Sequence, residues 1–155
     1  MEEQVTERMI IAGAPEHCFA VLTEFESYPE WAADIKAVTI DDRDEQDRAA
    51  RVTFRAAAFG RSTSYTLQYD YHAAPTALSW IQVAGDLTRR LDGAYELTPS
   101  GDGATEITYR LVVDLKVPLP GFVKRRAESR IMGTALRELK ARVEGDATPF
   151  PPAAS

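Results

Sequence analysis

One uninterrupted helical segment near the C-terminus limits the architectures that this chain can adopt. Pro118, Pro120 and Gly121 form a stiff turn that can precede a helix but cannot lie inside one, and no proline follows until Pro149. A helix from Gly121 to Glu144 is about 36 Å long at ~1.5 Å per residue. In a chain of 155 residues, a helix of this length must cross most of the molecule.

The sequence before this helix alternates between apolar and polar residues in a way that predicts β-strands. The clearest case is the segment 64–72, where Tyr65, Leu67, Tyr69 and Tyr71 alternate with polar residues. One face of such a strand is apolar and the other tolerates solvent, as in an antiparallel sheet that is buried on one side. Similar patterns predict strands over 4–12, 37–40, 50–59, 77–84, 86–98 and 105–116.

Two short helices are expected between the first strand and the rest of the sheet. Pro15 and Glu16 suit the first turn of a helix over 14–25. Backbone N–H groups in the first turn have no partner within the helix, so the missing N–H of proline costs nothing there. An acidic side chain is favoured at the same end by the helix dipole. Pro29 suits the first turn of a second helix in the same way. This second helix carries Trp31, which is either an anchor of the core or part of a pocket wall.

The order of the elements predicts an α+β fold. About six to seven antiparallel strands form a curved meander, and only the C-terminal helix is long enough to cover its apolar face. We expect a single ligand-binding domain over residues 1–144. The proline-rich segment 145–155 is expected to be a disordered tail.

Charge and residue counts argue against several classes of protein. The net charge of −6 argues against a nucleic-acid partner. Cys18 is the only cysteine and His17 and His72 are the only histidines, which is too few for a usual structural zinc site, and we expect no cofactor. No apolar run approaches the ~20 residues of a membrane span. The acidic N-terminus does not resemble a signal peptide, so we expect a cytoplasmic protein.

The charge is unevenly distributed along the chain. Residues 116–144 contain eight Lys or Arg against three Asp or Glu, whereas residues 1–115 contain ten against twenty. In one interpretation, a basic helix lies on an acidic sheet and both charged faces are solvated. In the other, the basic C-terminal helix makes a peripheral contact with an anionic membrane or with another protein.

No catalytic motif is present in the sequence. It contains no G-x-S-x-G, no Gly-rich phosphate loop and no H-E-x-x-H. His17 and Cys18 are adjacent on one short helix, so their side chains point about 100° apart and cannot form a dyad. These observations favour binding over catalysis.

The apolar stripe of the long helix is uneven. At ~100° per residue, one face of its second half is apolar and contains Met132, Ala135, Leu136, Leu139 and Val143. Toward the N-terminus the same face carries the polar residues Arg125, Glu128 and Ser129. Either this first half lines a wet or ligand-filled cavity, or the helix bends outward at Gly133. In the first case the second half is structural and the first half functional.

The apolar face of the predicted sheet offers aromatic side chains and two strongly polar ones. Its inward register contains Phe54, Tyr65, Tyr69, Tyr71, Trp80, Gln82, Arg89 and Tyr109. Large aromatic side chains with polar tips suit a flat, partly oxygenated ligand, although they also suit an ordinary core. An inward Arg89 must find a carboxylate such as Glu128, or a ligand oxygen. A β-bulge at Gly93 would instead place Arg89 outside.

Several segments resemble those of a known superfamily. They are A-P-E-H-C-F-A-V-L-T-E-F-E-S-Y-P-E-W (14–31), G-A-Y-E-L-T-P (93–99), T-E-I-T-Y-R-L (105–111) and P-L-P-G-F-V-K-R-R (118–126). In these segments the chain resembles the START-like (SRPBCC) superfamily, which includes polyketide cyclase/dehydrase-type, coenzyme-Q-binding START and birch-pollen-allergen-like proteins. The resemblance implies a helix-grip fold, in which a curved antiparallel sheet wraps the long helix and leaves a deep cavity between them.

The resemblance also implies a function. The first hypothesis is binding or transport of a hydrophobic small molecule, such as a lipid, a quinone or a polyketide. The alternative is a polyketide aromatase/cyclase-dehydratase that acts on a poly-β-ketone. In such an enzyme Arg89 would hold an enolate or carboxylate, with Tyr69 and Tyr109 as proton donors.

We expect binding without catalysis, because the sequence offers a cavity but no placed base. The turn at 118–121 is expected at the mouth of the cavity. The predicted ligand-binding residues are Trp31, Phe54, Tyr65, Tyr69, Trp80, Gln82, Arg89, Tyr109, Phe122, Arg125, Glu128 and Met132.

Overall fold

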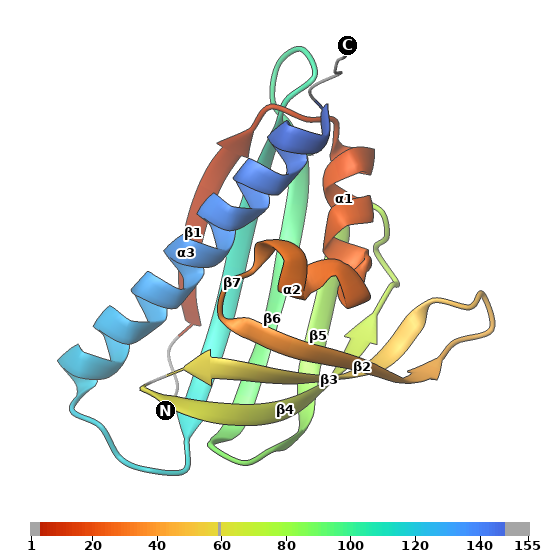
Figure 1. Cartoon of the computed structure of the whole chain (residues 1–155). Coiled ribbons are helices and arrows are strands. Elements are labelled where there is room, and N and C mark those ends of the chain that lie inside the picture. Colours follow the sequence, from red (N-terminus) through yellow and green to blue (C-terminus); the bar gives the residue numbers. More distant parts are fainter. Residues whose placement is uncertain (1–3, 59, 148–155) are drawn as a thin grey trace.

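The computed structural model describes residues 4–58 and 60–147, which form one antiparallel sheet with all helices on one side (Figure 1). The strands are β1 (Gln4–Ile11), β2 (Ile35–Arg43), β3 (Ala49–Ala58), β4 (Arg61–Asp70), β5 (Ala77–Gly85), β6 (Thr88–Pro99) and β7 (Thr105–Leu115). The helices are α1 (Pro15–Thr23), the 3₁₀ turn η1 (Phe25–Ser27), α2 (Tyr28–Trp31) and α3 (Gly121–Ala147).

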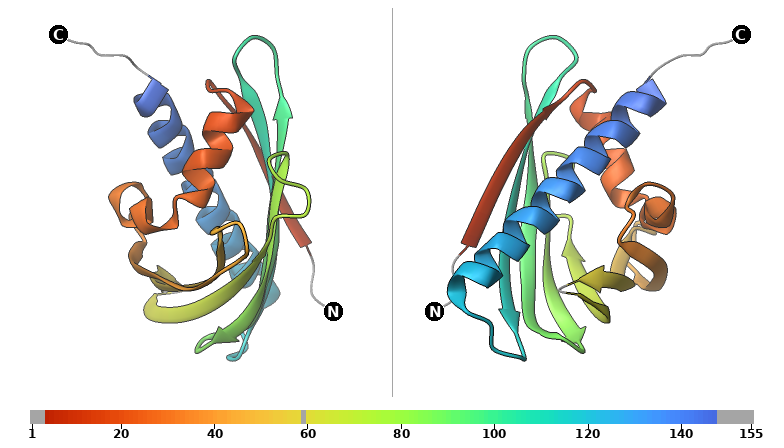
Figure 2. Two further views of the ribbon diagram at one scale, coloured as in Figure 1. Left: turned by 90° about the vertical axis from the view of Figure 1, so that its right-hand side faces the viewer. Right: turned by 60° about the vertical axis from the view of Figure 1, so that its left-hand side comes forward.

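Strands β2 to β7 form a meander, and β1 pairs with β7 as the edge strand of the sheet. Its order is β1-β7-β6-β5-β4-β3-β2, and each neighbouring pair is antiparallel. β2, β3 and β4 curl toward the side of the helices, so that the sheet bends around α3 (Figure 2). The predicted helix-grip architecture is therefore confirmed.

The two short helices begin as the sequence predicts. Pro15 and Glu16 lie in the first turn of α1, whose residues Cys18 and Leu22 are fully buried. α2 is a single turn with Pro29 in its first turn. Together with η1, these helices cover the part of the sheet that α3 leaves open (Figure 1).

The predicted long helix is confirmed as α3, which contains 27 residues and crosses the sheet diagonally (Figure 2). Its buried side chains are Glu128, Met132, Leu136, Leu139 and Val143. The helix continues through 145–147, the beginning of the segment predicted to be a disordered tail. Residues 148–155 of that predicted tail lie outside the described residues.

The inward registers of three strands are confirmed. Alternate residues are buried in β3 (Val52, Phe54 and Ala56), β4 (Leu67 and Tyr69) and β7 (Ile107, Tyr109, Leu111, Val113 and Leu115). These side chains belong to the same core as α1 and α3. The alternation arises because one face of each strand packs against the helices.

Strand β6 departs from the predicted register at Arg89. The pairing with β7 shifts between Thr88 and Arg90, which is a β-bulge. The extra residue leaves Thr88 buried and turns both Arg89 and Arg90 outward. The Arg89 side chain is 62% exposed and its Nη1 lies 4.0 Å from Oδ2 of Asp114. The prediction that Arg89 faces the cavity is therefore wrong.

Gly93 has a packing role and does not form the bulge. It stays in register opposite Leu111 on one side and Trp80 on the other. A Cβ atom at this position would lie only 2.6 Å from Cζ2 of Trp80 and 2.6 Å from the carbonyl oxygen of Arg110. Glycine therefore gives the indole of Trp80 room to lie flat against β6.

Candidate ligand-binding cavity

A cavity of about 160 Å³ lies between the concave face of the sheet, α2 and α3. Eight aromatic side chains line it: Tyr28, Trp31, Phe54, Tyr65, Tyr69, Trp80, Tyr95 and Tyr109. Aliphatic side chains such as Leu91 and Ile131 complete the walls. A dry cavity of about 150 Å³ in another protein binds benzene. This cavity therefore has room for about one aromatic ring in the described conformation.

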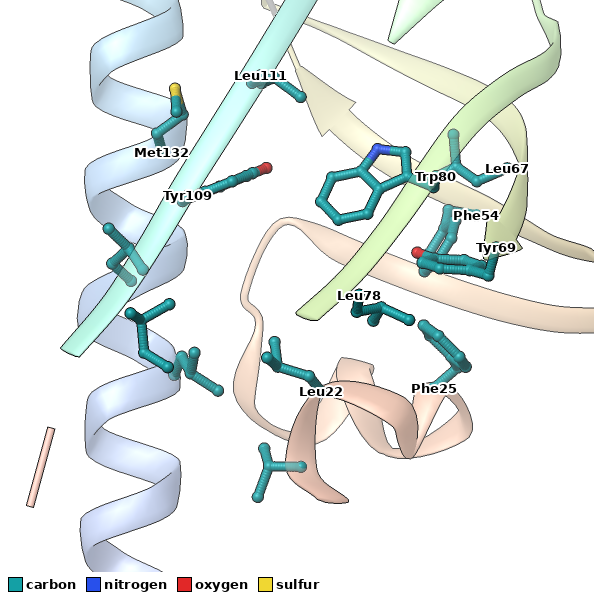
Figure 3. Packing of buried hydrophobic residues seen from close by; sticks show 14 of the residues in the cluster. Leu22, Phe25, Phe54, Leu67, Tyr69, Leu78, Trp80, Tyr109, Leu111 and Met132 are labelled. Carbon is teal, nitrogen blue, oxygen red and sulfur yellow. The ribbon is translucent and has the colours of Figure 1, made fainter. Parts of the chain in front are cut away.

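The aromatic rings of the wall, together with the core residue Phe25, pack on one another in a continuous row. Ring centroids are 4.5 Å apart between Phe25 and Tyr69, 5.8 Å between Tyr69 and Trp80, and 5.3 Å between Trp80 and Tyr95. Tyr95 and Tyr109 follow at 4.5 Å. Trp80 lies between Tyr109, on the side of α3, and the group of Phe25, Phe54 and Tyr69 (Figure 3). Such contacts add about 0.5–1.5 kcal/mol each beyond area burial, so the wall is held in place before a ligand arrives.

The tyrosine hydroxyl groups of the wall stay protonated at neutral pH. Burial raises the pKa of Tyr109 to about 12, although its hydrogen bond with Tyr95 acts in the opposite direction. Burial also raises the pKa values of Tyr65 and Tyr69 above the ordinary value of 10.0. The Tyr28 hydroxyl donates to the carbonyl oxygen of Leu22 at 2.6 Å. The Tyr28 proton is therefore already engaged, whereas the hydroxyl groups of Tyr65, Tyr69 and Tyr109 can donate hydrogen bonds or protons to a ligand, and none of the four can act as a base near pH 7.

One hydrogen-bond donor of the wall is left without a partner. The Trp80 side chain is 6% exposed, and its Nε1 is buried with no hydrogen-bond partner among residues 4–58 and 60–147. The nitrogen points away from Leu22 and Phe25 (Figure 3). A buried polar group without a partner costs about 1–3 kcal/mol. A hydrogen-bond acceptor that displaces the side chains covering this nitrogen would remove the cost.

Carboxylates supply the charge around the cavity. Glu128 on α3 is 2% exposed, and its Oε2 lies 2.9 Å from Nζ of Lys124. Oε2 of Glu138 accepts a hydrogen bond from the backbone N–H of Ala33 at 3.2 Å. The neighbouring Asp34 is exposed and also lines the cavity. Within the part of the chain that the structure describes, no set of three or more such side chains is arranged to hold a metal ion.

Gln82 was predicted to contact the ligand but is used inside the sheet. Its Nε2 donates to the carbonyl oxygen of Thr88 at 2.8 Å, and its Oε1 accepts from the Thr88 hydroxyl. Gln82 does not line the cavity, whereas Thr88 does. The side chain of Gln82 therefore ties β5 to the bulge of β6.

Seven of the twelve predicted residues line the cavity: Trp31, Phe54, Tyr65, Tyr69, Trp80, Tyr109 and Glu128. Besides Gln82 and Arg89, three others do not. Met132 is fully buried in the core. Arg125 is exposed and Phe122 is 64% exposed, because the first turns of α3 do not pack on the sheet. The turn at 118–121 contributes no residue to the cavity, so its predicted place at the mouth is not supported.

The long helix is divided by face, whereas the sequence predicts a division into a functional first half and a structural second half. Its core stripe contains Met132, Leu136, Leu139 and Val143, all buried. Its cavity stripe contains Glu128, Ile131, Thr134, Ala135 and Glu138. At ~100° per residue the two stripes are roughly a third of a turn apart. Ala135 therefore belongs to the cavity, and the exposed Ser129 belongs to neither stripe.

Some lining residues were missed by the sequence reasoning. Tyr28 and Tyr95 line the cavity but are not among the predicted ligand contacts. Thr88 faces inward only because of the bulge, which the sequence does not show. Asp34 and Glu138 come from segments that pair only in the folded molecule.

Comparisons with known proteins agree with this geometry. Residues 2–144 match the model of a family described as "Polyketide cyclase / dehydrase and lipid transport". A search of curated proteins finds no match.

Solved structures share the fold at low sequence identity. A START superfamily protein from Mycobacterium smegmatis has a TM-score of 0.88 and 22% identity, over 94% of this chain and 99% of that one. The Zhui aromatase/cyclase from Streptomyces sp. R1128 has a TM-score of 0.84 and 11% identity, over 99% and 100%. The di-domain aromatase/cyclase BexL of the BE-7585A biosynthetic pathway has a TM-score of 0.73 and 16% identity, over 95% of this chain and 48% of that one. At these identities the likeness concerns the fold alone.

Proposed function

The chain belongs to the polyketide cyclase/dehydrase and lipid transport family, and from this premise we propose that it binds a hydrophobic small molecule in the cavity between sheet and α3. The observation that carries the proposal is the preformed aromatic wall, with an open volume of about 160 Å³ inside it. Lipids, quinones and polyketide-like compounds all have apolar parts that such a wall would accept. A ligand larger than one ring would have to displace lining side chains, such as that of the partly exposed Trp31.

A cavity-filling substitution with a matched control tests this function. Ala135 lines the cavity from α3, whereas Ala141 lies on the exposed face of the same helix. We expect native mass spectrometry of the wild type to show a co-purifying small molecule. Ala135→Phe places a benzene-sized ring in a benzene-sized space and should abolish the adduct, whereas Ala141→Phe should retain it. An adduct that survives in Ala135→Phe places the ligand elsewhere.

A polyketide aromatase/cyclase-dehydratase is the alternative function. Tyr69 and Tyr109 would serve as proton donors and Glu128 would be the buried carboxylate. Arg89, the residue expected to hold an enolate, lies on the outer face and pairs with Asp114. The cyclase would therefore have to act without this cation. Turnover of a poly-β-ketone that is lost in Tyr109→Phe and kept in Arg89→Ala would favour the enzyme.

We also propose that the basic end of α3 contacts an anionic membrane surface. The segment 116–130, here called the basic segment, exposes four apolar side chains, Val117, Leu119, Phe122 and Val123. The same segment carries five cations, Lys116, Lys124, Arg125, Arg126 and Arg130. Apolar side chains flanked by cations suit the lipid interface, because the apolar side chains insert among the lipids and the cations meet anionic headgroups. No helix among residues 4–58 and 60–147 is long and apolar enough to span a bilayer.

Vesicle sedimentation tests this contact. Binding to vesicles that contain phosphatidylserine should fall about fivefold for each of Arg126→Gln and Arg130→Gln, since each basic residue contributes about 1 kcal/mol. Phe122→Ala should also weaken it, whereas Ile81→Ala removes another exposed apolar side chain, on the sheet, and should change nothing. Equal binding to neutral vesicles, or binding to an acidic protein but to no vesicle, would overturn the proposal.

A further inference from the structure

The charges around the cavity have one sign. Three carboxylates line it, those of Asp34, Glu128 and Glu138, and none of the described lining residues is Lys, Arg or His. Three cations next to lining residues lie beside carboxylates. Lys124 pairs with the buried Glu128 from outside the lining. On the outer face of β6, Arg89 lies beside Asp114 and Arg90 pairs with Asp92.

An anionic ligand would therefore be poorly stabilised in this cavity. A carboxylate that leaves water needs a cation or several donors as replacement, because its desolvation is costly. The walls offer tyrosine hydroxyls and one indole N–H, and the carboxylates repel a second negative charge. Electrostatic repulsion and the cost of desolvation thus both disfavour an anionic ligand.

The unpartnered donor of Trp80 points to what the ligand does carry. Its Nε1–H is buried in the wall, is not hydrogen-bonded to any residue of the described chain, and can only donate. The ring is fixed by Gly93 beneath it and by Tyr69 and Tyr95 beside it. The donor therefore has a set direction, and a ligand oxygen that displaces the side chains covering the nitrogen would complete its hydrogen bonding.

We infer that the cavity selects an uncharged, ring-sized ligand with a carbonyl oxygen that accepts from Trp80, and that it rejects the corresponding carboxylate. This inference rests on the proposed binding function and specifies the chemistry of its ligand. It distinguishes aryl ketones and quinone-like compounds from free fatty acids and aromatic acids. The apolar ring packs on the tyrosines, and the oxygen lies at the indole nitrogen.

Three probes of similar size separate the contributions of the ring, the carbonyl oxygen and the negative charge to binding. Acetophenone has the ring and a carbonyl oxygen, ethylbenzene has the ring alone, and benzoate is anionic at neutral pH. By isothermal titration calorimetry at neutral pH, acetophenone should bind about fivefold more tightly than ethylbenzene, as one net hydrogen bond of about 1 kcal/mol implies. Benzoate should bind at least tenfold more weakly than acetophenone.

Two variants test the assigned groups. Trp80→Phe keeps an aromatic ring but has no donor, so the ratio of acetophenone to ethylbenzene affinity should fall to about one. This ratio is measured within one protein, so a change in stability does not affect it. Glu138→Gln removes a charge at the cavity and should strengthen benzoate binding, whereas Asp70→Asn, on an exposed residue outside the cavity, should leave it unchanged.

Each outcome bears on a different claim. If none of the three probes binds to a folded wild type, the proposed binding function fails. If benzoate binds as tightly as acetophenone, the function stands and the inference about charge is overturned. If acetophenone and ethylbenzene bind equally to the wild type, or if their ratio survives in Trp80→Phe, the role of the indole nitrogen is refuted.

Discussion

Gly93→Ala is the most informative test of how the aromatic wall is built. The added methyl group would lie 2.6 Å from Cζ2 of Trp80 and 2.6 Å from the carbonyl oxygen of Arg110, closer than real Cβ contacts. Overpacking of this kind costs about 1–3 kcal/mol. Alanine also lowers the conformational entropy of the unfolded chain, which raises the free energy of unfolding by about 0.4–1 kcal/mol. We therefore expect a net loss of about 1–2 kcal/mol in the free energy of unfolding.

The thermal midpoint and the fluorescence of Trp80 report this change together. A loss of this size lowers the midpoint by about 2–8 °C in a chain of this length. The protein has two tryptophans, so a Trp31→Phe background isolates Trp80. We expect its emission to shift as the indole is pushed toward the cavity, and acetophenone binding to weaken.

Gly145→Ala is the matched control for Gly93→Ala. Gly145 lies in α3, and nothing in the structure lies within 4 Å of its added Cβ. The same substitution should there leave the protein as stable or raise its stability by up to about 1 kcal/mol. If Gly93→Ala matches the wild type in thermal midpoint, Trp80 emission and ligand affinity, the account of Gly93 as the support of Trp80 is refuted.

Two further perturbations probe the walls. Between pH 10 and 12 the folded protein keeps the Tyr109 proton, whose pKa is about 12, while the unfolded chain loses it near 10.0; stability should therefore fall with rising pH by roughly 2–3 kcal/mol. The free energy of unfolding, measured with urea across this pH range, should show this decrease in the wild type and a smaller decrease in Tyr109→Phe. Equal pH profiles for the two proteins would contradict the assignment to Tyr109. Lys124→Met leaves the Glu128 carboxylate buried without its cation and should cost about 1–3 kcal/mol, with Glu128→Gln in the same chain restoring most of it. A Lys124→Met protein of wild-type stability would show that the pair is not needed.

Alternation predicted the sheet well where one face packs without interruption. Tyr65, Leu67 and Tyr69 on β4 all face the side of the helices, as their spacing requires. The same reasoning failed on β6, where one extra residue at Arg89 reverses the facing. A bulge depends on the pairing between two strands, and no single-strand pattern reveals it.

The length of the long helix was predictable, but its rotation was not. Apolar spacing identified Met132, Leu136 and Val143 as its core stripe, and the structure buries all three. The cavity stripe contains small and polar residues such as Thr134, which look like solvent-exposed positions in the sequence. Which of the remaining faces meets the cavity depends on how the sheet curls, and this is a tertiary property.

The pairing of Glu128 shows a related limit. The sequence suggested Arg89 as its cation, because both were expected to face inward. The structure instead pairs Glu128 with Lys124, one turn earlier on the same helix. A local cation thus pairs with the buried carboxylate, and Arg89 is not available because the bulge of β6 turns it outward.

The central claim is that the aromatic cavity is the ligand site, and methyl-resolved NMR of the wild type tests it most directly. During titration with acetophenone, the account predicts shifts at the methyl groups of Leu91, Ile131 and Ala135, which line the cavity, and none at the exposed Ile10 and Ile81. Saturating shifts confined to Ile10 and Ile81, with the cavity methyl groups unchanged, would contradict it.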